Sequence, residues 1–350
     1  MTKSKFSWII PAILALLFFA GESFLNVSDV EARSSRAAAE EEDEDYSEDE
    51  EYSDEEEDAD SEESGDEYAD EEEEFDPDAP IPDPERVSGA RLQTKDNTLL
   101  SATYYPGNRG KKTVPVIILH DWSSDRKDVE VLAQELQANG CAVLIPDLRG
   151  HGKSNRYLVD AENTETFEAG KKFTMKDMQE IVNYDLPCLK RFLMQQNNSG
   201  QLNIDKLCVG GVGYGGLIAA FYANADWNPM VKRKKSMPTM GDVKGFFMVT
   251  PPKKIKGLDL MSSIQYPTWR ESISCIVVGG ESSKKVLKTT EAQIRKLCGK
   301  EALERCWFRD YEVKENGADL IQDPESDAVL DILAFIDLRC IKRDILWKRR

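Results

Sequence analysis

The sequence predicts an α/β protein with a mostly parallel, doubly wound sheet, because apolar strand-like runs alternate with helical patterns along it. Two continuous apolar runs, 114–119 and 141–146, have the composition of parallel strands that are buried on both faces. The segment between them, 129–138, carries apolar residues at helical spacing and is followed by Gly140, a common residue after a helix. This strand-helix-strand unit is the building block of such a sheet.

The other expected elements continue this alternation in chain order. Residues 86–94 and 98–105 predict an antiparallel pair of strands, since apolar alternation flanks the turn residues Asp96 and Asn97. Further strands are expected at 202–209, 245–250, 273–279 and 306–313. Further helices are expected at 175–196, directly after a glycine-rich turn at 210–216, at 284–297 and at 326–339.

Residues 1–32 predict a secretory signal peptide or an N-terminal anchor. Lys3 and Lys5 precede an apolar run of 13 residues at 8–20. A membrane-spanning helix needs about 20 apolar residues, so this run has the length of a signal-peptide core. Residues 30–32 form a poor cleavage site, which leaves retention as a membrane anchor as the alternative. We therefore expect an exported protein that is periplasmic, part of the cell envelope or secreted.

Residues 33–85 predict a disordered acidic linker before a domain at 86–350. Between 40 and 78 the chain has 27 acidic residues and no Lys or Arg, and the net charge of −20 leaves +7 for the rest. Such a segment cannot bury enough apolar surface to fold. It predicts a spacer, or a polyanion that binds cations, a basic partner or the chain's own basic clusters at 232–235, 253–256 and 348–350. No nucleic-acid partner is expected.

Three motifs occur in order around the expected strands. His120, Asp121 and Trp122 directly follow the strand at 114–119, and the stretch DLRGHGKS at 147–154 follows the next strand. The stretch CVGGVGYGG at 208–216 has the spacing of the G-x-S-x-G turn, in which a nucleophilic serine lies between a strand and a helix. Gly213 occupies the place of that serine.

Together these motifs resemble the α/β-hydrolase superfamily, in particular its esterase and serine-aminopeptidase-like branch, over residues 86–340. The resemblance implies a doubly wound sheet of the α/β-hydrolase type. Only about 20 residues separate the strands expected at 245–250 and 273–279, so we expect a minimal cap or none.

In that family a serine attacks the substrate, a histidine takes its proton, and an Asp or Glu orients the histidine. The resemblance places Gly213 at the nucleophile position, Ser283 or its neighbour Ser282 at the acid position, and Asn316 at the base position. Both histidines of the chain precede Gly213, and Glu281 is adjacent to the acid position but out of register. The site therefore has no expected catalytic residue, and Gly213→Ser alone is not expected to restore esterase activity.

The family's oxyanion loop corresponds to His120, Asp121 and Trp122, with Tyr214 following the nucleophile position. Asp121 replaces the usual glycine, and a carboxylate at this place opposes the negative charge that develops in acyl transfer. His120 and His151 are expected to hydrogen-bond to nearby backbone rather than to act in catalysis or bind a metal. No cofactor and no metal ion is expected.

Four aromatic residues are candidates for an apolar pocket above Gly213: Trp122, Tyr214, Trp227 and Trp269. Scattered core and loop positions are the expectation for most of them, and a pocket forms only if some of them cluster above the corner. The seven cysteines are too dispersed for a disulfide framework, and at least three lie in expected core strands. If the domain is exported, the sequence allows one disulfide, between Cys298 and Cys306.

These patterns predict a catalytically degenerate, exported protein of the α/β-hydrolase type that binds an unidentified ligand or protein. One alternative is an active ester or peptide hydrolase whose catalytic residues do not align with those of the family. Another is a structural component of the cell envelope, in which the acidic linker carries the function.

Overall fold

A computed structural model describes residues 80–227, 241–255, 258–259, 272–299 and 302–350. Residues 1–32, nearly all of 33–85, the basic cluster at 232–235 and Trp269 lie outside these ranges. Among the described residues, no helix combines the length and the apolar character that a membrane crossing requires.

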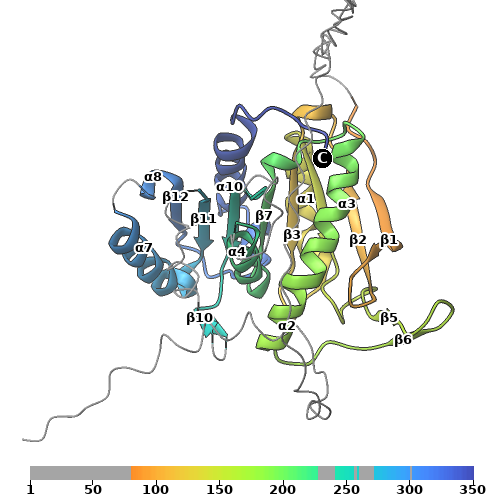
Figure 1. The fold of residues 1–350 in the computed structure, drawn as a ribbon. Helices are drawn as coiled ribbons and strands as arrows, with labels where there is room; N and C mark the ends of the chain where they lie inside the picture. The colour runs from red at the N-terminus through yellow and green to blue at the C-terminus, as the bar shows by residue number, and fades with distance from the viewer. Residues whose placement is uncertain (1–79, 228–240, 256–257, 260–271, 300–301) are drawn as a thin grey trace, which may run out of the picture. The chain divides into compact units, whose positions relative to one another are not determined.

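The described part of the chain contains one ten-stranded sheet and a separate short hairpin (Figure 1). The strands β3, β4, β7, β8, β11 and β12 are parallel to one another, and β1 and β2 are antiparallel to their neighbours. Across the sheet the order is β12 (Cys306–Asp310), β11 (Ser274–Gly279), β8 (Gly245–Val249), β7 (Cys208–Val212), β3 (Val114–Leu119), β4 (Cys141–Pro146), β2 (Thr98–Tyr105), β5 (Arg156–Leu158) and β6 (Thr164–Thr166), with β1 (Glu85–Gln93) also paired to β2 and the hairpin formed by β9 (Lys254–Ile255) and β10 (Leu258–Asp259).

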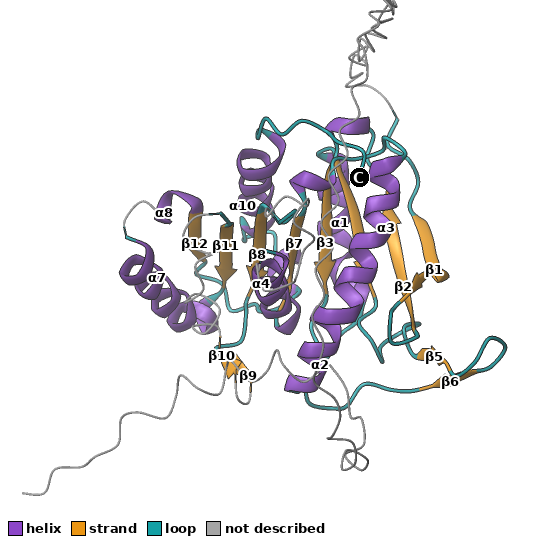
Figure 2. Cartoon of the chain, viewed as in Figure 1, coloured by secondary structure: helices purple, strands orange, loops and turns teal. Residues whose placement is uncertain are grey.

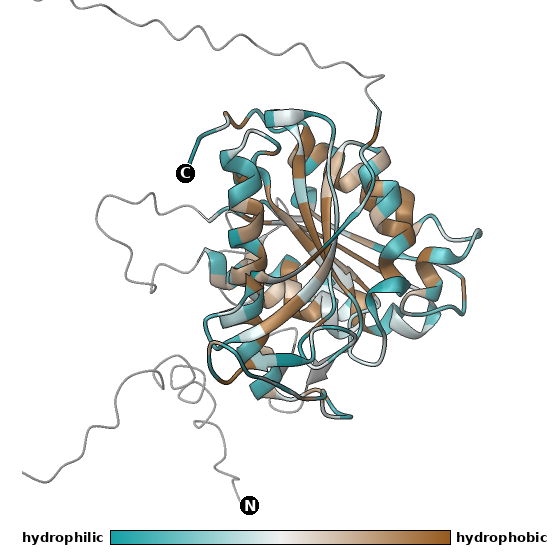
Figure 3. Ribbon diagram, turned by 90° about the vertical axis from the view of Figure 1, so that its right-hand side faces the viewer, coloured by the Kyte–Doolittle hydropathy of each residue, from teal (hydrophilic) through white to brown (hydrophobic). Residues whose placement is uncertain are grey.

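Helices cover both faces of this sheet (Figure 2). Alternate residues of each central strand belong to two separate apolar clusters, so the sheet is buried on both sides (Figure 3). One cluster includes α3 (Leu186–Asn198), α4 (Tyr214–Asp226) and α7 (Lys284–Cys298), and the other includes α1 (Glu130–Ala138) and α10 (Ala328–Ile336). Shorter helices are α2 (Met175–Glu180), α8 (Ala302–Arg305) and α9 (Asp319–Gln322).

The strand β3 lies where the strand order reverses. The chain passes from β3 to β4 on one side and later returns to β7 on the other side. Leu119 of β3 pairs with Gly211 of β7, so the residues after both strands meet at one edge of the sheet. In open α/β sheets, ligands bind outside the carboxyl ends of the strands at such a point.

The structure confirms the doubly wound sheet and the leading antiparallel pair, but it corrects two elements. The strand expected at 202–209 begins only at Cys208, as β7. Before it, the Asn203 side chain accepts a hydrogen bond from the Asp205 amide (3.1 Å) and starts a 3-10 turn, Ile204–Lys206. The long helix expected at 175–196 contains a π-helical turn, Ile181–Asp185, just before Pro187. Proline lacks an amide hydrogen and crowds the preceding turn, which explains the interruption. The hairpin of β5 and β6 was not predicted.

Six of the seven cysteines are buried core thiols, and Cys298 is half-buried. Cys306 carries a free thiol, so the bridge considered between Cys298 and Cys306 is not formed. Cys141, Cys208 and Cys340 are fully buried in one apolar cluster, and burial raises the pKa of Cys141 to about 12. Thiols in such surroundings behave as small apolar groups.

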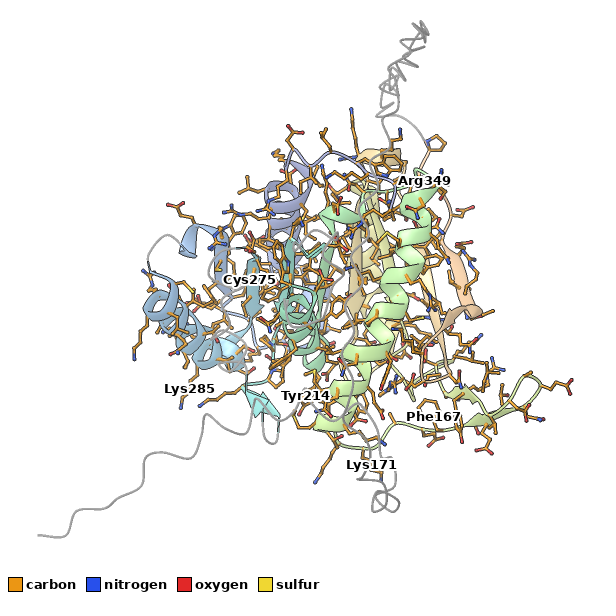
Figure 4. The ribbon with its side chains drawn as sticks, in the orientation of Figure 1. Phe167, Lys171, Tyr214, Cys275, Lys285 and Arg349 are labelled. Carbon is orange, nitrogen blue, oxygen red and sulfur yellow. The ribbon has the colours of Figure 1, made fainter. Side chains whose placement is uncertain are left out.

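The last residues of the chain are anchored on the domain, at the edge of the sheet opposite Tyr214 (Figure 4). The Trp347 indole nitrogen donates to the Leu202 carbonyl oxygen (3.1 Å), and the Arg350 guanidinium pairs with Asp205 (2.7 Å) and Asp242. The basic end of the chain at 348–350 is therefore not entirely a solvated cluster, since Arg350 already has carboxylate partners.

Replacing Arg350 with alanine is expected to lower the free energy of unfolding by about 1–2 kcal/mol. The Asp242 side chain is only 4% exposed and would keep Lys190 (2.5 Å) as its remaining ion-pair partner. Urea unfolding measures the change. Arg349→Ala is the matched control, because Arg349 is exposed, and its effect should stay within about 0.5 kcal/mol. Equal effects of the two substitutions would contradict the anchoring role.

Candidate active site

The corner between β7 and α4 is formed by Gly213. Its backbone has φ +54° and ψ −121°, in the region that residues with a Cβ adopt only with strain. The strand and helix also approach closely, because an added Cβ on Gly215 would overlap the Leu119 carbonyl oxygen. The corner thus keeps the sharp geometry of a nucleophile turn but presents no side-chain atom that could attack a substrate.

The carboxylate of Asp121 occupies the space beside this corner. Its Oδ1 accepts a hydrogen bond from the Tyr214 amide (2.7 Å), and its Oδ2 accepts one from the Ser123 hydroxyl (3.0 Å). A Cβ added to Gly213 would overlap Oδ1 far inside van der Waals contact. In α/β hydrolases the amide after the nucleophile holds the oxyanion of the transition state. Here that amide already binds an internal anion.

The loops at the acid and base positions contact each other. The Ser282 hydroxyl donates a hydrogen bond to Oδ1 of Asn316, whereas Ser283 is buried beside Gly279. Of the two candidate serines, the one that contacts the base position is therefore Ser282. A hydroxyl paired with a carboxamide cannot accept a proton from a nucleophile at neutral pH.

The Asn316 loop is also tied to the end of β8. The Gly317 amide donates to the Thr250 hydroxyl (2.8 Å), and Thr250 has φ +47°. A positive φ is a strained conformation for a β-branched residue. The loops after β8, β11 and β12 are thus joined by polar contacts at the carboxyl edge of the sheet.

Both histidines hydrogen-bond to nearby backbone. His120 is fully buried, its Nε2 accepts from the Leu148 amide (2.9 Å), and its Nδ1 donates to the Asp121 carbonyl oxygen (2.7 Å). Burial lowers the pKa of His120, which favours this neutral tautomer. The ring nitrogens of His151 face the carbonyl oxygens of Trp122 (2.7 Å) and Arg149 (3.1 Å). These contacts join the loops after β3 and β4.

The described aromatic residues lie in scattered core and loop positions, as expected for most of them, and Trp269 lies outside the described residues. Trp122 is 5% exposed and packs against Phe173 (centroids 4.8 Å apart), which in turn packs against Tyr214 (5.1 Å). Trp227 lies at the far end of α4 and donates to the Val243 carbonyl oxygen (2.6 Å). These rings fill space near the corner or lie away from it.

A cavity of about 420 Å³ lies beside the loop that begins at His120 and Asp121, here called the oxyanion-type loop, and Gly213 is not among its lining residues. Residues 122–124, 150–152, Asn155 and 168–171 line it. Lys171 marks its position at the carboxyl edge of the sheet in Figure 4. The lining offers hydroxyl, amide, carboxylate and ammonium groups beside the rings of Trp122 and His151.

Arg149, in the loop after β4, is surrounded by three carboxylates. Its buried guanidinium pairs with Asp185 (2.5 Å), Asp96 (2.9 Å) and Glu180 (3.0 Å). Burial opposes the charge of Arg149, but its hydrogen bonds to Asp185 and Asp96 outweigh burial and raise its pKa. Burial raises the pKa of Asp185 to about 6, because one guanidinium shared by three carboxylates offsets only part of the desolvation.

The Asp185 carboxyl is expected to make stability fall as pH rises. The pKa of Asp185 is 3.8 in the unfolded chain and about 6 in the folded chain, so between these pH values the folded state binds more protons than the unfolded state. The stabilisation that this protonated carboxyl gives is fully present below pH 3.8 and is lost as the pH rises through 6. Relative to Asp185→Asn, wild type should lose on the order of 2–3 kcal/mol between these limits, measured by urea unfolding. Parallel pH profiles of the two proteins would contradict this.

The described residues contain no group of three or more His, Cys, Asp or Glu side chains arranged to hold a metal ion.

Comparison with known proteins identifies the fold. Residues 110–248 match the family model of the serine aminopeptidase family S33. Esterase B from Lactobacillus rhamnosis superposes with a TM-score of 0.51 at 15% identity, over 76% of this chain and 89% of its own. A Pyrococcus furiosus esterase gives 0.50 at 16% identity, over 74% and 93%. An esterase from Pyrobaculum calidifontis gives 0.50 at 13% identity, over 75% and 87%.

The domain has the α/β-hydrolase fold and resembles the serine-aminopeptidase and esterase branch of that superfamily. A search of curated proteins found no match to the sequence. Sequence reasoning placed Asp121 and Tyr214 in the oxyanion-type loop, but it missed their hydrogen bond and the ion cluster around Arg149. Both depend on side-chain directions that motif spacing does not encode.

Proposed function

We propose that this protein is a catalytically inactive α/β-hydrolase-fold protein that is exported and binds a small polar ligand or a protein partner. The observation that carries the proposal is the occupied corner. Gly213 offers no nucleophile, and the Asp121 carboxylate accepts the hydrogen bond of the Tyr214 amide. Two further features support it. Ser282 and Asn316 form a neutral pair at the acid and base positions, and both histidines are engaged with backbone.

The absence of catalysis is tested with simple substrates. The purified chain should hydrolyse p-nitrophenyl acetate and amino-acyl p-nitroanilides no faster than an equal concentration of an unrelated protein. Saturable turnover that a single substitution abolishes would support the alternative, an active ester or peptide hydrolase with catalytic residues outside the aligned positions.

Export is supported by Lys3 and Lys5 before the apolar run at 8–20. The full-length chain, produced with a C-terminal tag, should be recovered outside the cytosolic fraction. Replacing both lysines and two central leucines of the run, Leu14 and Leu16, with glutamate should return it to the cytosol. Cytosolic recovery of the unaltered chain would contradict export.

The cavity beside the oxyanion-type loop is the candidate ligand site of the proposed binding protein. Its size falls within the range of small-molecule sites, about 300–1,000 Å³. Its lining includes Trp122, whose indole nitrogen donates to the Gly170 carbonyl oxygen (2.8 Å), and His151, whose Nε2 faces the Trp122 carbonyl oxygen (2.7 Å). Because these two rings are held in place, that part of the wall needs little ordering when a ligand binds.

A further inference from the structure

A groove of about 250 Å³ lies between the end of α1 and α10. Apolar side chains of both helices line it, among them Leu136, Leu333 and Ile341. Cys141, the first residue of β4, also lines it, so the groove lies at the amino ends of the parallel strands. Gly213 follows the carboxyl end of β7, so the groove and the candidate active site lie at opposite edges of the sheet.

The outer side of α10 continues the groove as an exposed apolar stripe. Leu330 is 64% exposed and Leu338 is 45% exposed, and the exposed Ala334 between them is one of the lining residues of the groove. Residues four apart lie on one face of a helix. An apolar stripe next to an apolar groove is typical of a surface that another segment covers.

The described chain begins beside this groove. The Gln137 side-chain nitrogen donates to the carbonyl oxygens of Pro82 (2.9 Å) and Pro106 (2.8 Å). Gln137 directly follows Leu136, so Pro82 is fixed next to the helix that forms one wall of the groove. Figure 1 shows that the described chain starts at the end of the sheet at which α10 also ends.

The segment that precedes Pro82 contains one side chain suited to the groove. Phe75 is the only large apolar residue in 69–80, and it precedes Pro82 by seven residues. Seven extended residues span at most about 25 Å, whereas the nine residues of α1 are only about 13 Å long. Phe75 can therefore reach the groove from the point at which Gln137 holds the chain.

The charges around Phe75 and around the groove are opposite. Residues 71–78 carry six carboxylates and no basic residue. The segments 109–112 and 341–344, which include the lining residues Arg109 and Ile341, carry five basic residues and one acidic residue. The lining carboxylate of Asp337 already pairs with Lys342 (2.6 Å), so it opposes an acidic segment less than a lone carboxylate would.

We propose that Phe75 docks in the groove between α1 and α10, with the acidic residues of 71–78 against the basic segments 109–112 and 341–344. The end of the acidic linker is then an intramolecular ligand of its own domain. This contact covers the apolar groove and leaves the cavity at the carboxyl edge of the sheet open.

Photo-cross-linking of the full-length chain tests this proposal. With p-benzoylphenylalanine in place of Phe75, irradiation should give cross-links within one chain, mapped by mass spectrometry to 136–141 or 333–341. The matched control carries the same group in place of Tyr52, which has acidic neighbours of the same kind but lies 30 residues before Pro82. The yield from position 75 should be at least fivefold higher than the yield from position 52.

A substitution in the groove provides the second arm. Ala334→Trp fills the groove from an exposed position and should lower the yield from position 75 at least threefold, while the melting temperature shows that the domain stays folded. Ala161→Trp, in the exposed turn between β5 and β6, should leave the yield unchanged. Equal yields from positions 75 and 52, cross-links mapped elsewhere or to a second chain, or a yield that Ala334→Trp does not lower would each overturn the inference.

Discussion

Arg149→Ala is expected to lower the free energy of unfolding by about 3–5 kcal/mol, the largest effect we anticipate for a single side chain. The substitution removes the only cation paired with Asp185 among the described residues, and the Asp185 side chain is 4% exposed. It also leaves Asp96 and Glu180 close together without the charge between them. Urea unfolding at pH 7 gives the value directly.

The matched control is Arg295→Ala. Arg295 also pairs with a glutamate, Glu291 (2.8 Å), but both side chains are well exposed on α7. An exposed pair of this kind contributes less than about 0.5 kcal/mol. Adding Asp185→Asn to Arg149→Ala should recover part of the loss, because the buried charge is then gone. A loss below about 1 kcal/mol for Arg149→Ala would show that the cluster does not hold the loop after β4 in place.

Gly213→Ser is expected to be destabilised by about 2–5 kcal/mol and to remain without esterase activity. The destabilisation has two causes, the positive φ of the corner and the overlap of the new Cβ with Asp121. Activity is not expected because Asn316 stands at the base position and the Tyr214 amide is already occupied. Urea unfolding and p-nitrophenyl acetate hydrolysis measure the two outcomes.

Gly200→Ser separates the two causes. Gly200 also has a positive φ, +79°, but an added Cβ there has no neighbour within 4 Å. Gly200→Ser should therefore lower the free energy of unfolding through backbone strain alone, by about 1–2 kcal/mol. A Gly213→Ser protein as stable as Gly200→Ser would mean that Asp121 moves aside easily, and measurable turnover by Gly213→Ser would mean that a base lies outside the aligned positions.

Much of the fold could be predicted because its signals are local. The continuous apolar runs that became β3 and β4 have no polar residue to expose, so both faces had to be buried. The boundaries of β7 and the break before Pro187 were harder to predict, because a 3-10 turn and a π-helical turn depend on hydrogen bonds that apolar periodicity does not encode. The β5–β6 hairpin has too few apolar residues to give a pattern.

The candidate site was predictable in its positions but not in its contacts. Motif spacing located Gly213, Asp121 and Asn316, because each follows a strand that ends at the same edge of the sheet. The choice of Ser282 rather than Ser283 as the partner of Asn316 depends on a single turn of backbone. Likewise, a carboxylate in the oxyanion-type loop could have pointed to solvent, and only the structure shows it on the Tyr214 amide.

Labelling of the wild-type chain with a serine-directed fluorophosphonate probe is the most direct test of the central claim. The probe reacts with serine nucleophiles that a neighbouring base activates, whatever the natural substrate. With Gly213 at the corner and Asp121 on the Tyr214 amide, intact-mass measurement should show no adduct after prolonged incubation. One adduct per chain, absent from heat-unfolded protein and mapped to a specific serine, would show that the domain is an active hydrolase.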